Sequence, residues 1–409
     1  MGDRIEATLV RYEDDEALLA VRGADGREGL RLVPVSELGG YDLVEEGSAD
    51  PALEAELKAW ETPFPSWRPA SERVAGALLG AALGDALGVR YENMSANRLS
   101  RFLPGDLADG MGFASDDTEH AAMTVAAIAE GGGDPARFAR AMARRLRLWF
   151  AAVPPGVGLA TLKSCARLCL GVPPERSGVF SAGNGPLMRA PVIGAAFDER
   201  ENRLAHVRAA TVITHRDPKA LRAADAVSEM TALASSLYPG TMPTARQVLD
   251  LLRPGAAECA EWDGLVAKLA EAMDAGDSPR AFAVAIGHGR GVSGYIYPSA
   301  FVAIHAWWAG RGQAEAAIRE ALLCGGDTDS VAAVTGALCG ATCGPDGLPA
   351  RLLSAWRDRP LTVDALRRHA AALDGGPLPS IPWPLVALRN LAFLAWCVGV
   401  IARRALPPY

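Results

Sequence analysis

The stretch VAGALLGAALGDALGVRYE, residues 74–92, contains a glycine at every fourth position. These glycines are Gly76, Gly80, Gly84 and Gly88. Residues four apart lie on one face of a helix, and a face without side chains lets another helix approach closely. Asp85 and Glu92 argue against a membrane span. The stretch therefore predicts a core helix that is packed tightly against its neighbours.

The sequence around this helix predicts an all-α body over residues 70–375. Helical patterns follow one another from Ser71 onward, and alternating β-branched runs are scarce after residue 70. The 409-residue chain is 50% hydrophobic and 22% charged, which allows one large core.

Residues 1–62 have a different pattern. The segments IEATLVRY, EALLAVRG and LRLVPVSEL are short and partly alternating, and turn-forming residues separate them. They predict a small antiparallel β-rich module. The stretch ETPFPSWRPAS, residues 61–71, is rich in proline and predicts a linker.

Residues 376–409 form an apolar C-terminal extension. Leu385 to Ala402 approach the length of a membrane span, but Arg389 and Asn390 interrupt the run. The favoured interpretation is a helix docked on the body, and the alternative is a tail or interfacial anchor that contacts a membrane.

The composition of the chain indicates which kinds of partner and which cellular compartment to expect. The net charge is −7, whereas a general nucleic-acid binder would normally be basic. The seven cysteines form no Cys-x-x-Cys pair, and the six histidines do not cluster, which disfavours disulfide frameworks and zinc sites. No secretory pattern opens the chain. We expect a cytoplasmic, monomeric protein that does not bind nucleic acid.

Two distant stretches each place a pair of acids before an apolar helical run. They are ASDDTEHAAMTVAAIAEG, residues 114–131, and CGGDTDSVAAVTGALCGA, residues 324–341. One acid can cap a helix, but two adjacent acids repel each other when they are buried. If Asp116, Asp117, Asp327 and Asp329 converge, they require protons or cations, and oxygen ligands suit magnesium or manganese. The alternative is that each pair caps only its own helix.

Several motifs occur in an order that resembles the ADP-ribosylglycohydrolase family, which includes dinitrogenase reductase-activating glycohydrolase. They are GALLGAALGDALGVRYE, SDDTEHA, FSAGNGPLMRAPVIG, TVITHRDPKA, GVSGYIYPS and GGDTDSVAAVTGALCGA. The resemblance covers residues 72–360. It implies a single large orthogonal helical domain, two Mg²⁺ or Mn²⁺ ions, and hydrolysis of the N- or O-glycosidic bond between ADP-ribose and an acceptor.

The resemblance also implies roles for residues of this chain. The metal ligands would be Ser115, Asp116, Asp117, Asp327, Asp329 and Ser330. Glu92 and Asp116 are both candidates for the general base. Substrate contacts would come from Ser181, Gly183, Asn184, Gly185, His215 and Tyr295. The plainer interpretations are a glycine turn at 183–185, a histidine at a helix end, and a tyrosine packed in the core.

Two other functions compete with this one. The protein could hydrolyse N-ribosyl bonds in a small-molecule metabolite, with the same fold and metals. It could also be a non-catalytic ADP-ribose-binding or structural protein of this fold, although all of the acids expected among the metal ligands are present. The expected partner is an ADP-ribosylated protein or a ribosylated small molecule.

Overall fold

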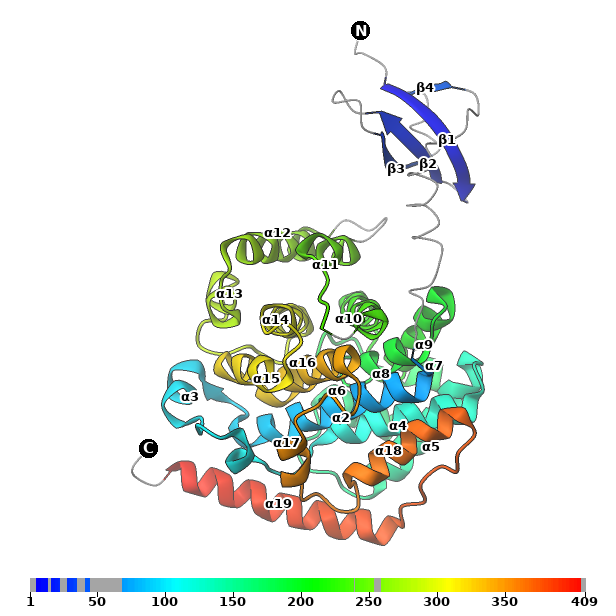
Figure 1. Ribbon diagram of the computed structural model, residues 1–409. Coiled ribbons are helices and arrows are strands. Elements are labelled where there is room, and N and C mark those ends of the chain that lie inside the picture. The colour runs from blue at the N-terminus through cyan, green and yellow to red at the C-terminus, as the bar shows by residue number, and fades with distance from the viewer. Residues whose placement is uncertain are drawn as a thin grey trace. The chain divides into compact units, whose positions relative to one another are not determined.

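The structure is a computed structural model (Figure 1). It describes residues 5–13, 16–22, 28–34, 41–44, 68–238, 240–253 and 259–405. The chain divides into two compact units, Met1–Pro65 and Ser66–Tyr409.

The described part of the first unit is a four-stranded sheet. Its strands are β1 (Ile5–Glu13), β2 (Glu16–Arg22), β3 (Glu28–Pro34) and β4 (Tyr41–Val44), in the order β3-β2-β1-β4. The β1–β2 and β2–β3 pairs are antiparallel, but β1 and β4 are parallel, which the all-antiparallel interpretation did not include. β4 follows β3 in the chain but pairs with β1 at the opposite edge of the sheet, so these two neighbouring strands are not joined by a hairpin. The remainder of residues 1–62, and the linker up to residue 67, lie outside the described residues.

The second unit is helical, as the sequence predicted. Its elements in chain order are α2 (Ala70–Gly88), η2 (Val89–Tyr91), β5 (Met94–Ser95), α3 (Ala96–Phe102), η3 (Leu107–Gly110), α4 (Asp116–Gly131), α5 (Pro135–Ala151), α6 (Leu159–Cys169), α7 (Pro174–Ser177), α8 (Ala190–Ala196), α9 (Arg200–Val212) and α10 (Pro218–Ser236). The others are α11 (Ala245–Leu252), α12 (Ala260–Ala275), α13 (Pro279–Ala285), α14 (Ile296–Ala309), α15 (Ala314–Leu323), β6 (Gly325–Gly326), α16 (Thr328–Cys343), α17 (Ala350–Ala355), α18 (Val363–Ala371), η4 (Ala372–Asp374) and α19 (Trp383–Ala405).

Helices α2 and α16 form the centre of this unit and touch backbone to backbone. A Cβ atom on Gly80 would lie 2.0 Å from the carbonyl oxygen of Gly336, and one on Gly84 would lie 1.9 Å from that of Ala332. Contacts of the same kind run from Gly76 to Gly88. The prediction of a tightly packed core helix is therefore confirmed.

Local signals in the sequence explain where many helices begin. Asp134, Asp217 and Ser278 each cap a helix through the side chain, and a proline follows each of them at the first helical position. Thr244 and Gln247 form a capping box at α11. Helix α4 ends at Gly131 and is capped by Gly132, which has a left-handed backbone.

The helices of this unit do not all run in one direction. In Figure 1, α10 and α14 are seen nearly end-on, while α2 and α16 run across the view. Two described helices, Ala70–Tyr91 and Trp383–Arg404, are long and apolar enough to cross a membrane by length and composition. The apolar window of the first is 94% buried inside the protein, whereas that of the second is only 17% buried. Within the C-terminal extension, α19 is thus one long helix, and most of its residues are not buried.

Candidate active site

Asp85 of α2 holds the start of α4 in place. Its carboxylate is fully buried and accepts hydrogen bonds from the backbone N–H of Ser115, at 2.8 Å, and of Thr118, at 3.0 Å. The Thr118 hydroxyl also donates to it. Ser115 caps α4 by accepting from the N–H of Asp117. The SDDT turn therefore projects from a rigid support.

Two glycines set the start of α16. Gly325 and Gly326 have φ angles of +71° and +85°, and a Cβ on Gly326 would lie 2.0 Å from the carbonyl oxygen of Val292. The strand pair β5–β6 and the 2.7 Å bond from the Asp327 N–H to the Val292 carbonyl bring segments 92–95, 290–294 and 325–327 together. This explains why the second acidic turn has to begin with two glycines.

The two acidic helix starts lie side by side, although more than two hundred residues separate them. The Ser330 hydroxyl donates a 3.1 Å hydrogen bond to Oδ2 of Asp117. Burial, together with the charges of neighbouring acids, raises the pKa values of Asp116, Asp117 and Asp329 well above their ordinary value. Ionising all of these acids together is therefore costly unless a positive group shares the cluster.

Two carboxylate oxygens in this cluster have no protein partner. Oδ1 of Asp117 and Oδ1 of Asp329 are both buried without a hydrogen bond. Across the described residues, no group of three or more His, Cys, Asp or Glu side chains has the arrangement of a metal-ion site. The direct link between the two turns is thus the hydrogen bond from Ser330 to Asp117.

Glu92 lies at the edge of a pocket beside the cluster. The pocket has a volume of about 420 Å³, and its lining includes Glu92, Arg290, Ser293 and Asp327. Burial and the charge of Asp327 raise the pKa of Glu92. Asp116 is buried and does not line this pocket. Of the two candidate bases, Glu92 is the one that faces the space where a small molecule could bind.

The predicted loop at residues 181–185 adjoins the second acidic turn. The side-chain amide of Asn184 donates to Oδ2 of Asp327 at 2.7 Å and to the Ser299 hydroxyl at 2.8 Å. Its carbonyl oxygen, Oδ1, is buried without a partner. The Ser181 hydroxyl accepts from the N–H of Gly183 at 3.3 Å. The loop is therefore ordered by its own contacts and by the acidic cluster.

His215 and Tyr295 support this loop from two sides. A Cβ atom on Gly185 would lie 2.5 Å from Cε1 of His215, so the histidine packs directly beneath the glycines. Burial and the nearby Arg189 lower the pKa of His215 to about 3, which keeps the ring neutral. Tyr295 pairs with Gly183 in an isolated β-bridge, and its hydroxyl donates to Glu261 at 2.7 Å.

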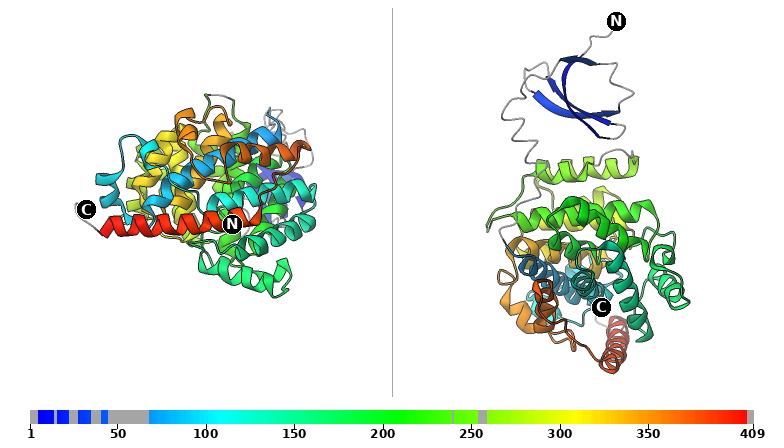
Figure 2. Two further views of the ribbon diagram at one scale, coloured as in Figure 1. Left: turned by 90° about the horizontal axis from the view of Figure 1, so that it is seen from below. Right: turned by 90° about the vertical axis from the view of Figure 1, so that its right-hand side faces the viewer.

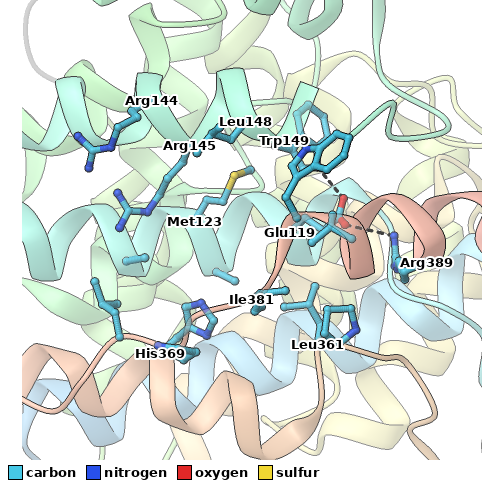
Figure 3. Close-up of a pocket in the computed structure, with 17 residues that line it drawn as sticks. Glu119, Met123, Arg144, Arg145, Leu148, Trp149, Leu361, His369, Ile381 and Arg389 are labelled. Carbon is cyan, nitrogen blue, oxygen red and sulfur yellow. Dashed lines mark hydrogen bonds and ion pairs between the residues drawn. The ribbon is translucent and has the colours of Figure 1, made fainter. Parts of the chain in front are cut away.

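The sequence did not predict two residues that hold the segment just before the first acidic helix start, at Ala114. Asp358 accepts from the N–H of Ala114, and Arg389 of α19 donates to the carbonyl of Ala114 and to Asp358. Figure 3 shows Arg389 and Trp149 both directed at Glu119, with bonds of 3.2 Å and 2.7 Å. Arg389 and Asp85 are both charged residues inside apolar runs of the sequence. That pattern could have marked them as buried residues with fixed partners.

A family profile described as ADP-ribosylglycohydrolase matches residues 67–377. The chain belongs to the ADP-ribosylglycohydrolase family. This confirms the resemblance drawn from the motifs, and a family of glycohydrolases supports a hydrolase function. Helix α19 and the N-terminal sheet lie outside the matched residues.

Two relatives agree with the family assignment. An uncharacterized protein of Archaeoglobus fulgidus is 31% identical over 303 residues, which are 70% of this chain and 92% of that protein. A solved structure described as an ADP-ribosylglycohydrolase-related protein complex is 26% identical and matches with a TM-score of 0.55. That match covers 74% of this chain and 97% of the other.

Proposed function

We propose that this protein hydrolyses the N- or O-glycosidic bond that joins ADP-ribose to an acceptor. The observation that carries the proposal is the meeting of the two acidic helix starts, linked by Ser330 and Asp117, beside a pocket of about 420 Å³. A pocket of this size is within the range that binds small ligands.

The chemistry of the cluster fits two divalent cations, Mg²⁺ or Mn²⁺. The residues that would hold them are Ser115, Asp116, Asp117, Asp327, Asp329 and Ser330. The unpaired Oδ1 atoms of Asp117 and Asp329 and the raised pKa values of the buried acids are what an oxygen-liganded cation would relieve. When bound, such ions supply positive charge toward ribose hydroxyls and lower the pKa of a nearby water.

Glu92 is our choice for the general base. Its carboxylate faces the pocket, and a raised pKa makes it a better proton acceptor than an ordinary glutamate. In the proposed reaction, Glu92 accepts a proton from the attacking water as the water oxygen bonds to C1 of the ribose. The bond from C1 to the acceptor breaks, and the acceptor takes up the proton that Glu92 accepted, which returns Glu92 to its ionised form. Negative charge on Asp327 would stabilise the positive charge that develops on the ribose.

The surrounding residues suit the rest of ADP-ribose. Arg290 is exposed at the pocket, and its guanidinium could bind the diphosphate in a bidentate manner. The loop from Ser181 to Gly185 offers backbone N–H groups close to Asp327, and Asn184 can hydrogen-bond to sugar hydroxyls.

The test is a panel of ADP-ribose conjugates with defined linkages. It contains ADP-ribosyl-arginine, ADP-ribosyl-serine and a free N-ribosylated nucleotide metabolite, each assayed with Mg²⁺, with Mn²⁺ and with a chelator. We expect release from at least one linkage, and loss of release on chelation. Equal rates in chelated and metal-loaded protein would contradict the metal assignment. No release from any linkage by metal-loaded protein that binds ADP-ribose would support a non-catalytic binding protein instead.

A further inference from the structure

Helix α19 has an outward face that consists almost entirely of apolar side chains. Six large residues on this face have exposed fractions between 49% and 65%: Leu385, Leu388, Leu391, Leu394, Val398 and Ile401. Among the exposed positions that the structure describes on this helix, Arg403 carries the one charge. A continuous exposed apolar face of this length marks an interaction surface.

The opposite face of α19 is fixed to the body by polar anchors. Arg389 forms buried ion pairs with Asp358 and Glu119, and the Asn390 side chain donates to the carbonyl of Ala152 at 2.9 Å. Arg404, fifteen residues after Arg389, donates to the carbonyl of Glu92. Detaching the helix to cross a membrane would leave buried acids without their counter-charge. The helix therefore interacts with its partner while it remains on the protein.

The shape of the exposed face favours a broad surface over a single partner helix. At 100° per residue, the exposed positions from Trp383 to Arg403 spread over roughly 200° of the helix circumference. Contact with one other helix uses a stripe of about 100°. Figure 2 (left) shows α19 lying along its full length across the face of the protein that is seen from below, so a flat partner can reach all of it.

Arginines lie at both ends of α19, although the whole chain carries −7. At the first end, Trp383 lines a pocket together with Arg144 and Arg145, the two arginines labelled in Figure 3. Both of these cations pair with the single acid Glu130. At the other end, Arg98 donates to the carbonyl of Arg404, beside Arg403. Helix α19 contains no Asp or Glu.

We propose that this face docks on an anionic lipid surface, with α19 lying in the plane of the interface. The apolar side chains would enter the boundary between head groups and acyl chains, and the flanking arginines would meet lipid phosphates. Trp383, which is half exposed, suits the same boundary.

The test uses the full-length protein and vesicle flotation. Vesicles contain either phosphatidylcholine alone or phosphatidylcholine mixed with phosphatidylglycerol. We expect binding to the mixed vesicles, weaker binding at high salt, and a loss of at least about tenfold in the double variant Leu391→Glu, Val398→Glu. The matched control is Val284→Glu on α13, which is 57% exposed and should bind like the wild type. Circular dichroism and thermal unfolding check that each variant is folded.

Three results would overturn the proposal. The first is no binding to either kind of vesicle. The second is equal binding to both kinds, which would remove the anionic requirement. The third is a dimer in light scattering that the double variant splits into monomers, because the face would then be a contact between two copies of this chain.

Discussion

Single buried acids carry the chemistry that we propose, and they also weaken the fold that contains them. Asp85 is the exception, because hydrogen bonds from Ser115 and Thr118 satisfy its carboxylate. Asp117 and Asp329 each keep one oxygen without a partner. In the function that we propose, a bound cation would satisfy these oxygens and offset the cost of burying them.

The variant Asp117→Asn should lose activity and gain stability in the absence of metal. Removal of the carboxylate takes away a ligand for the proposed cations, so we expect the hydrolysis rate to fall at least about 100-fold. It also removes a charge that burial disfavours, so chelated protein should be about 1–2 kcal/mol more stable to unfolding. Rates and urea unfolding measure the two effects. Asp346→Asn, at an exposed acid, is the control and should change neither.

A second acid, away from the site, predicts a pH dependence of stability. Burial raises the pKa of Asp225 to about 7, and the charge of Glu229 adds to the increase. The unfolded chain ionises this carboxyl near 3.8, so folding loses stability as the pH rises from about 4 to 7. Asp225→Asn should therefore stabilise the protein by about 1–3 kcal/mol at pH 8 and by almost nothing at pH 4. A stabilisation of equal size at both pH values would contradict this origin.

At the scale of elements, the site depends on how closely α2, α4 and α16 approach. The sequence predicted the central helix from its glycines and the two acidic helix starts from their spacing. It could not predict that Asp358 and Arg389 brace the first start, because nothing local relates residue 114 to residue 389. It also could not decide between Glu92 and Asp116, since the choice depends on which carboxylate faces the pocket.

Gly336→Ala should drive the two central helices apart. The added Cβ would lie 2.1 Å from the carbonyl oxygen of Gly80, and no rotamer can relieve that contact. We expect a loss of at least about 2 kcal/mol of unfolding free energy and a matching loss of activity. Gly264→Ala on α12 has open space around its Cβ and should stabilise the protein by about 0.5–1 kcal/mol. Thermal unfolding of the two alanine variants compares them directly.

Arg389→Met should destabilise the protein far more than the loss of an exposed arginine. The variant leaves Asp358 and Glu119 buried without their counter-charge, which costs about 3–5 kcal/mol. Arg368→Met breaks an exposed pair with Asp364 and should cost less than about 0.5 kcal/mol. Similar costs in the two variants would show that the buried pairs do not hold α19 in place.

For the whole molecule, every residue of the proposed site lies in the unit Ser66–Tyr409. A protein that begins at Ser66 should therefore fold and hydrolyse the same linkages as the full chain. Melting temperature and rates on the conjugate panel measure this. A shorter protein that folds normally but no longer hydrolyses one linkage would assign substrate selection to residues 1–65.

The fold class of the body was predictable because its helical periodicity extends over most of the sequence after residue 70. The pairing of β4 with β1 was not predictable, because no local sequence pattern encodes which distant strand it joins.

The glycine contacts between α2 and α16 have one more consequence. The atom in the way of any added side chain is a peptide oxygen on the opposite helix, and every amino acid carries that oxygen. If two side chains collided, a smaller residue at the second position could relieve the clash. No replacement on the opposite helix can remove a peptide oxygen. If a randomised library of this protein is selected for folded variants, we expect glycine at these positions even when all neighbouring positions are varied.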